Sequence, residues 1–220
     1  MAAVLDHLVI AAATLEQGLA WAERTFGLGP AGRGRHALMG THNALWHLAL
    51  PAAPDAYLEV IAIDPAAVAP ERPRWFGLDD ANVQSRLDEH PRLVAWQVRP
   101  GMALVDAIGA ARTAGIDPGD ALALTRDDLA WRLTVTADGR VPEGGRFPIL
   151  IEWAEGTRRP PERLAPGGLA LEALTLSAGT PALGRALQAI EAAQLVTSTA
   201  DGPALTARLS TPAGPVTIAS

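Results

Sequence analysis

One histidine and two glutamates interrupt apolar segments of this 220-residue chain, in a pattern that suits metal binding. His7 lies in LDHLVIA, Glu59 in YLEVI and Glu152 in LIEWA, and the two glutamates occupy equivalent places in their segments. Burying an unpaired carboxylate costs on the order of several kcal/mol, so each needs a cation, a metal or strong donors unless water reaches it. Imidazole and carboxylate ligands suit a divalent ion, and we therefore predict a metal site formed by His7, Glu59 and Glu152.

The alternative is a purely structural role for these three residues. A single histidine on a strand is more often a hydrogen-bonded core or surface residue, and strand ends tolerate glutamate where water is near. The recurrence of glutamate at equivalent places favours the metal site. None of the three belongs to a spaced His/Cys motif, so the pattern alone leaves both interpretations open.

The composition excludes several other kinds of chemistry. The chain has no cysteine, and all 18 basic residues are arginine. Without cysteine there is no thiolate nucleophile, disulfide or thiolate zinc site. Without lysine there is no Schiff base, phosphate-loop lysine or lysine general base. The formal net charge of -6 and the pI near 5.3 argue against a nucleic-acid partner, which usually requires a basic face.

The first 13 residues are apolar but hold Asp6 and His7 and lack a basic flank. They are too short for a membrane span and unlike a secretory signal. We therefore expect a cytoplasmic protein without a membrane partner.

The elements that must position these residues follow a repeated order. The segment 5–11 is a predicted strand, and a helix follows it, with Thr14 and Gln17 as a capping box and Gly27 as the stop. A glycine-rich loop then leads to predicted strands at 44–50 and 57–63, separated by the Pro-Ala-Ala-Pro-Asp turn at 51–55.

The same order of strand, helix and strands returns twice. The second unit has predicted strands at 93–98, 131–136 and 148–153 and a helix at 104–113; the third has strands at 169–177, 195–198, 204–210 and 216–219 and a helix that begins at Thr180 and Pro181. Units of about 50–60 residues rarely bury a sheet face alone and must pair. We predict an α+β fold of repeated β-α-β-β-β units, two of them paired and the third left over.

Two connectors differ from ordinary loops. Residues 64–91 form a segment long enough to carry structure or function, with Asp79 or Asp80 capping a short helix. The proline-rich run 157–168 is predicted to be an extended linker. We therefore divide the chain into domains 1–156 and 157–220. The third unit would expose apolar sheet surface unless it folds back on the other two or pairs across a homodimer, and the linker favours the homodimer.

Several of these segments together resemble a known family. The segments are LDHLVI from residue 5, RH at 35–36 with MGTHNAL from residue 39, YLEVIA from residue 57, 93–97, WRLT from residue 131 and LIEW from residue 150. They are similar to glyoxalase-like domain proteins of the vicinal oxygen chelate superfamily. The resemblance implies that two units pair into a cupped eight-stranded sheet, with metal ligands on the first and last strands of each unit. His7, Glu59 and Glu152 match three of these positions, and Trp96 or Gln97 falls at the fourth.

The resemblance also places other side chains at the cup. Thr41, His42 and Asn43 would lie at its rim and contact a ligand, although the segment also suits an ordinary turn. Trp131 and Arg132 must face opposite sides of their strand, so only one enters the cup: a tryptophan would wall a planar ligand, and an arginine would hold a carboxylate. The segment Arg126-Asp127-Asp128 is predicted to be a solvated turn.

Two functions follow as hypotheses. The first is a metal-assisted lyase or isomerase, in which Zn, Mn, Ni, Co or Fe polarises an oxygen of a small oxygenated substrate and Glu59 or His42 moves the proton. The second is a metal-free protein that binds or sequesters a small molecule in the same cup. The fourth ligand position separates them, because Gln97 offers an amide oxygen and Trp96 offers none.

Overall fold

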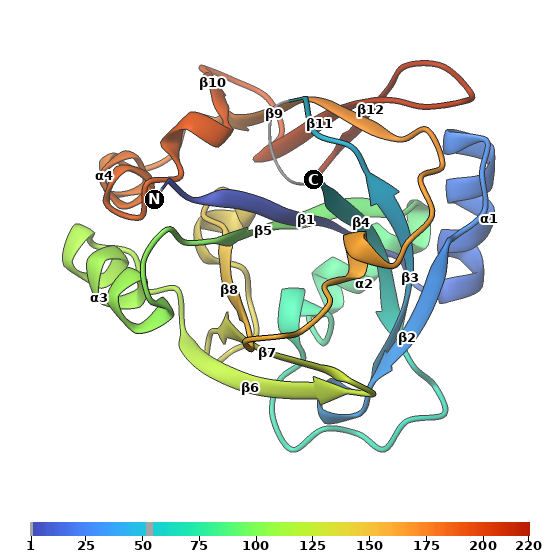
Figure 1. The fold of residues 1–220 in the computed structure, drawn as a ribbon, viewed down its shortest axis with the longest axis horizontal. Coiled ribbons are helices and arrows are strands. Elements are labelled where there is room, and N and C mark those ends of the chain that lie inside the picture. The colour runs from blue at the N-terminus through green and yellow to red at the C-terminus, as the bar shows by residue number, and fades with distance from the viewer. Residues whose placement is uncertain (1, 52–54) are drawn as a thin grey trace.

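The computed structural model describes residues 2–51 and 55–220, and its main sheet has eight strands. These are β1 Val4–Ala11, β2 Gly32–His36, β3 Thr41–Leu48, β4 Ala56–Ile63, β5 Arg92–Arg99, β6 Asp120–Arg126, β7 Leu129–Val135 and β8 Ile149–Trp153. They follow the order β2-β3-β4-β1-β5-β8-β7-β6 and curl into a nearly closed cup (Figure 1). The predicted α+β fold with repeated β-α-β-β-β units is confirmed. We call the concave side of this sheet the cup.

Strand pairing explains how two units make one sheet. Within each unit the first strand lies parallel to the last, β1 beside β4 and β5 beside β8. The two units meet where β1 runs antiparallel to β5. This junction brings the first and last strands of both units to the middle of the sheet, with His7 directly opposite Gln97.

Helices α1 Leu15–Phe26 and α3 Leu104–Ala114 occupy the same place in the two units, and α2 Ala81–Glu89 lies between the units. The capping signals predicted for α1 are present: Thr14 Oγ1 accepts from Gln17 N at 3.1 Å, and Gly27 ends the helix with φ of 72°. Asp80 caps α2, as one of the two predicted alternatives. None of the helices in the described ranges is both long and apolar enough to cross a membrane.

Strands β2 and β6 were not predicted from the sequence. The segment expected to be a glycine-rich loop contains β2, and β3 begins at Thr41, three residues before the predicted strand. Thr41, His42 and Asn43 therefore belong to a strand and not to a turn. Part of the predicted turn at 51–55 lies outside the described residues.

The third unit has the predicted order of elements. It contains β9 Ala170–Ser177, α4 Pro181–Ala189, β10 Thr197–Thr199, β11 Leu205–Ser210 and β12 Val216–Ala219. Its sheet runs β10-β9-β11-β12, so its first strand lies in the middle, parallel to β10 and antiparallel to β11. This pairing differs from that of the first two units, where the first strand lies beside the last.

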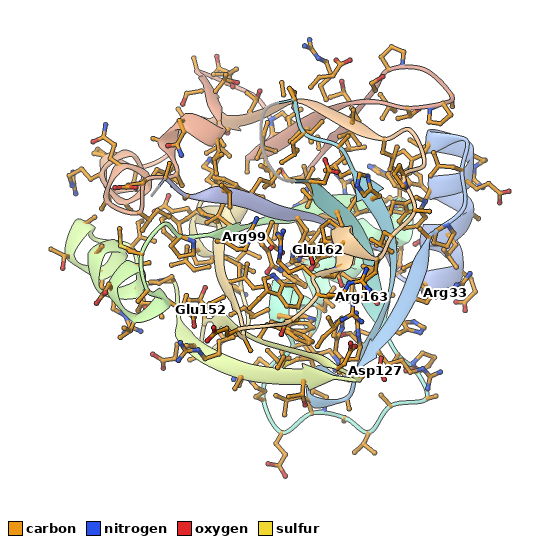
Figure 2. The ribbon with its side chains drawn as sticks, viewed as in Figure 1. Arg33, Arg99, Asp127, Glu152, Glu162 and Arg163 are labelled. Atoms are coloured by element: carbon orange, nitrogen blue, oxygen red, sulfur yellow. The ribbon has the colours of Figure 1, made fainter. Side chains whose placement is uncertain are left out.

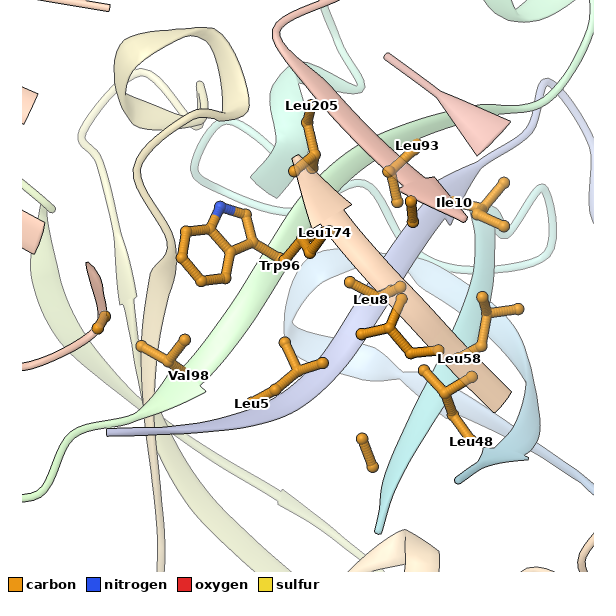
Figure 3. Packing of buried hydrophobic residues seen from close by; sticks show 14 of the residues in the cluster. Leu5, Leu8, Ile10, Leu48, Leu58, Leu93, Trp96, Val98, Leu174 and Leu205 are labelled. Carbon is orange, nitrogen blue, oxygen red and sulfur yellow. The ribbon is translucent and has the colours of Figure 1, made fainter. Parts of the chain in front are cut away.

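The apolar face of the third unit is buried against the convex side of the main sheet. Leu174 and Leu205 are 3% and 0% exposed and share one core with Leu8, Leu93 and Trp96 (Figure 3). Helices α3 and α4 lie side by side (Figure 1). The linker does not hold the unit away. Of the two expected ways of covering this face, folding back on the first two units is the one that the structure has. The argument for a homodimer loses its basis, because the chain covers the face itself.

Candidate functional site

The cup encloses a small cavity, with about 30 Å³ of free volume at its centre, that we call the cup cavity. This volume holds about two water molecules. Two short 3-10 turns supply part of the lining: η2 Trp75–Gly77, from the long connector, contributes Trp75 and Phe76, and η4 Pro160–Glu162, from the predicted linker, contributes Pro160. The polar lining comprises His7, His36, Asn43, Tyr57, Glu59, Gln97 and Arg126, and the rest of the lining is apolar or aromatic: Leu45, Trp131, Leu133, Ile151 and Trp153.

A β-bulge in β1 allows two consecutive residues to take part in the site. The register with β5 shifts between Leu5 and His7, so Asp6 is the extra residue of the bulge. Asp6 Oδ1 lies 2.8 Å from His7 Nδ1. A carboxylate accepts, so His7 carries its proton on Nδ1 and presents Nε2 as an acceptor.

Asp6 is held in turn by two donors. Trp153 Nε1 donates to Asp6 Oδ2 at 2.9 Å, and Arg99 Nε lies 3.1 Å from the same oxygen. Burial by itself would raise the pKa of Asp6, but His7, Trp153 and Arg99 outweigh it and lower the pKa below its ordinary value. Asp6 is therefore a charged, fixed support for the imidazole.

Glu59 faces His7 across the parallel strands β1 and β4. The side chain is buried; Asn43 Nδ2 donates to its Oε1 at 2.5 Å, while its Oε2 lies 3.7 Å from His7 Nε2. The ring of Tyr57 stacks on that of His7 with centroids 4.1 Å apart and planes at 19°. Burial, followed by the charges of Asp6 and Glu59, raises the pKa of Tyr57 well above its ordinary value, so the phenol stays protonated.

Gln97 completes the polar centre from β5. It is 2% exposed, lines the cup cavity, and its Oε1 has no hydrogen-bond partner among the described residues. Trp96 faces the convex side and donates from Nε1 to the carbonyl of Arg146 at 3.2 Å. Of the two alternatives for the fourth ligand position, Gln97 is the one that enters the cup.

Glu152 lies on the opposite face of the sheet from His7 and Glu59. It accepts from Leu104 N at 3.3 Å at the start of α3 and pairs with Arg132. Figure 2 labels Glu152, which lies close to α3. The hydrogen bond from Arg132 is the largest cause that lowers the pKa of Glu152. The predicted convergence of all three residues is therefore wrong, because β8 presents Ile151 to the cavity instead.

The predicted ligand-contacting residues divide by strand face. Asn43 and Trp131 line the cup cavity, whereas Arg132 points away from it to Glu152. Thr41 lies beyond the cavity lining, where its Oγ1 is 3.1 Å from His36 Nδ1.

His42 lies on the opposite face of β3 from Asn43, because side chains alternate between the two faces along a strand. It pairs in register with Ala62, a residue of the convex-side core. It lies on the wrong face to move a proton in the cup cavity. The prediction of a catalytic His42 is therefore not supported by its position.

Arg126 is a site residue that the sequence reasoning missed. It lies at the end of β6, and its Nη1 is 3.3 Å from His36 Nε2 and 3.4 Å from Asn43 Oδ1. The prediction of a solvated turn was wrong for Arg126. The available signal was strand alternation, since Leu122 and Leu124 precede it at two-residue spacing and pack on the concave side.

His36 is neutral at this position. Burial, then the charges of Arg126 and His7, lower its pKa to about 3. A neutral ring can accept from Arg126 through Nε2 and donate from Nδ1 to Thr41, which fits both contacts.

A second, larger cavity lies on the other side of Phe76. It has a volume of about 380 Å³ and is bounded by α2, the start of β5 and the segment 140–144. Phe76 lines both cavities and adopts φ of 60° and ψ of 15°, in the left-handed region. Such a conformation costs on the order of 1–3 kcal/mol in a residue with a side chain.

A family model described as a glyoxalase-like domain matches residues 5–211. The chain belongs to this family. The predicted resemblance to glyoxalase-like domain proteins is thereby confirmed. A comparison with curated proteins gives no match.

Three solved structures are similar to this glyoxalase-like protein at low sequence identity. A hypothetical protein from Staphylococcus aureus is 12% identical, with a TM-score of 0.54, and the match covers 100% of this chain and 86% of that one. Methylmalonyl-CoA epimerase from Streptomyces coelicolor, in complex with 2-nitronate-propionyl-CoA, is 15% identical, with a TM-score of 0.44 and coverage of 70% and 97%. The epimerase from Mycobacterium tuberculosis is 18% identical, with a TM-score of 0.39 and coverage of 68% and 85%.

Proposed function

We propose that the cup cavity binds a divalent cation together with a small oxygenated molecule, and that it supports proton transfer of the lyase or isomerase kind. The observation that carries this proposal is a set of three acceptors lining one cavity: His7 Nε2, Glu59 Oε2 and Gln97 Oε1. Acceptors that line one buried space require donors or a cation. The hydroxyl of Tyr57, 3.4 Å from His7 Nε2, is one such donor, and Gln97 Oε1 has none among the described residues.

The chemical types of these three ligands suit such an ion. Imidazole nitrogen, carboxylate and amide oxygen are ligands of Zn, Mn, Fe, Co and Ni. The described residues contain no cluster of three His, Cys, Asp or Glu for a metal, so Gln97 would have to be the third ligand. When bound, the ion would polarise an oxygen of the substrate.

The protein's own residues would perform the remaining tasks. Asp6 holds His7 with Nε2 toward the cavity, and Asn43 holds Glu59 by Oε1. This leaves Glu59 Oε2 as a ligand of the ion or, when it is not bound to the ion, as the acceptor of a proton. Trp131 and Trp153 wall the cavity and exclude water, which strengthens the electrostatic interactions inside.

Metal binding can be tested by adding Mn²⁺ to metal-free protein and following the melting temperature and the electron paramagnetic resonance signal of free Mn²⁺. An ion that binds only the folded state stabilises it by about 2.7 kcal/mol at 100 times its Kd. Glu59→Gln should abolish both effects. Glu152→Gln is the matched control, because the same change on the convex face should leave Mn²⁺ binding intact.

The second candidate is a metal-free binding site in the same cup. The observation that favours it is Ile151, an apolar residue on the β8 face where a fourth ligand would be needed. If Mn²⁺, Zn²⁺, Co²⁺ and Ni²⁺ all leave the wild-type melting temperature unchanged, this candidate replaces the first.

A further inference from the structure

Arg126 brings a positive charge into the cup cavity, and no carboxylate of the described residues lies within ion-pair distance of it. Of the described residues that line the cavity, it is the one arginine, and its Nη1 contacts two neutral partners, His36 and Asn43. Most other arginines near the site are paired, as Arg99 is with Asp6 and Arg132 with Glu152. A partly buried guanidinium without a counter-ion favours an anionic ligand.

The guanidinium is oriented by the residues around it. It lies against the backbone of β2 at Gly34, where a Cβ would come within 2.1 Å of Nη1 and 2.5 Å of Cζ. The contacts of the Arg126 guanidinium with His36 and Asn43 both use Nη1. An arginine carries five N–H donors, so the rest of the fork has donors to offer a ligand.

We propose that Arg126, seated in the slot that Gly34 leaves open, is the carboxylate-binding residue of the site, and that the ligand is a small 2-oxo or 2-hydroxy carboxylate. A carboxylate matches the planar fork of an arginine with two parallel hydrogen bonds. Asn43 lies between Arg126 and Glu59 and contacts both. A carboxylate bound to Arg126 would therefore place the oxygen on the ligand's adjacent carbon near the centre of the cavity.

The oxygen on the carbon next to the carboxylate defines the class of ligand. In a 2-oxo or 2-hydroxy acid it would face His7, Glu59 and Gln97, and this second contact rests on the proposed function, whereas the carboxylate contact does not. The free volume of about 30 Å³ is smaller than a three-carbon acid, so pyruvate would enter only as the side chains of Trp75 and Phe76 move outward.

The test is calorimetric titration with pyruvate and with pyruvamide, its uncharged analogue of nearly the same shape, in metal-free buffer. We expect the wild type to bind pyruvate and to bind pyruvamide at least tenfold more weakly. Arg126→Gln should lower the affinity for pyruvate about ten- to hundredfold, since hydrogen bonds to charged groups have effects of this size. Arg126→Lys should recover only part of it, because lysine lacks the fork.

Gly34→Ala tests the slot without changing any polar group. Its methyl group must displace the guanidinium, so pyruvate binding should fall as it does in Arg126→Gln. Gly29→Ala is the matched control: no atom lies within 4 Å of its added Cβ, and pyruvate binding should not change. Equal melting temperatures of the two alanine variants would show that Gly34→Ala remains folded.

Three results would overturn the assignment: no binding of pyruvate by the wild type, pyruvate affinity of Arg126→Gln within twofold of wild type, or equal affinity of the wild type for pyruvamide and pyruvate. Mn²⁺ binding, measured separately on the same variants, reports on the proposed function. Loss of Mn²⁺ binding with pyruvate binding intact would reject the cation and leave the carboxylate site standing.

Discussion

Single hydrogen bonds fix the orientation of the polar residues inside the cup. Asp6 sets the tautomer of His7, and Asn43 connects the guanidinium of Arg126 to the carboxylate of Glu59. His36 stays neutral so that it can accept from Arg126. Each of these residues is supported by another polar residue, which keeps the site pre-organised before any ligand binds.

Lowering the pH should destabilise the folded protein, because His36 is buried and neutral. Its pKa of about 3 lies below the ordinary value of 6.5, so the unfolded chain takes up a proton that the folded chain does not. The resulting stability is fully present above about pH 6.5 and is lost as the pH falls toward 3, by up to about 1.4 kcal/mol per pH unit. Urea unfolding at pH 7, 6, 5 and 4 measures this slope.

His36→Gln should flatten the slope between pH 6.5 and 4. The exposed His90, at the end of α2, offers the control His90→Gln, which should retain the wild-type slope. Parallel curves for the wild type and His36→Gln would show that another group determines the acid sensitivity.

Sequence reasoning identified His7, Glu59, Asn43 and Trp131 correctly as cup residues but misplaced Glu152. The physical reason is that both faces of this sheet are buried, the concave face around the cavity and the convex face under helices and the third unit. Apolar residues on both faces remove the contrast that normally shows which side is inside. The bulge at Asp6 also leaves no mark in a single sequence.

At the scale of elements, helices with clear end signals were predicted within one or two residues, as the caps Thr14 and Thr180 show. Strands β2 and β6 were missed for a different reason. The sequence of β2 is GRGRH, which offers glycine and arginine where strand prediction needs branched or aromatic residues. Antiparallel pairing with β3 holds this segment as a strand, although its own residues do not favour one.

Close packing of α1 on β4 depends on Gly18. A Cβ there would lie 2.5 Å from Val60 Cγ1 and 3.0 Å from Ala12 Cβ, so Gly18→Ala must push the helix and sheet apart. We expect a loss of about 1–3 kcal/mol from overpacking, which exceeds the gain of about 1 kcal/mol from replacing a helical glycine. Chemical denaturation measures the difference.

Gly109 in α3 provides the matched substitution. No atom lies within 4 Å of its added Cβ, and the residue is exposed. Gly109→Ala should therefore raise the free energy of unfolding by about 0.5–1 kcal/mol. If both variants were stabilised, the packing of α1 against Val60 would be looser than the structure indicates.

At the scale of the whole molecule, the main sheet and the third unit share one hydrophobic core. Leu174 from the third unit is 3% exposed and belongs to the same cluster as Trp96 of the main sheet (Figure 3). Residues 157–220 are therefore stabilised by the cup, and the cup by them. The proposed domain division at residue 156 remains a prediction about folding units.

Leu174→Ala should destabilise the whole chain by about 2–5 kcal/mol, because the cavity it leaves lies at the shared core. We expect one unfolding transition that moves to lower temperature, followed by tryptophan fluorescence from the cup and by circular dichroism. Two separate transitions, with only one shifted, would show that the third unit unfolds independently.

The covered third unit also changes the expected mass in solution. Because its apolar leucines are already buried within the chain, the exposed patch that favoured a homodimer is absent from the described residues. Light scattering at micromolar concentration should give one chain, 22.9 kDa. A mass of twice this value would require an interface elsewhere on the surface.

Phe76 acts as a partition, with a space for about two water molecules on one side and a chamber of about 380 Å³ on the other. The size limit on ligands is thus set by one aromatic ring and not by the curvature of the sheet. Phe76→Ala would join the two spaces at a cost in packing, and the alanine would keep the left-handed backbone conformation of residue 76. In a series of 2-oxo acids of increasing chain length, affinity for the variant should rise by about three- to fourfold per methylene, while the wild type rejects the longer members. The same fold would then serve as a scaffold with adjustable selectivity.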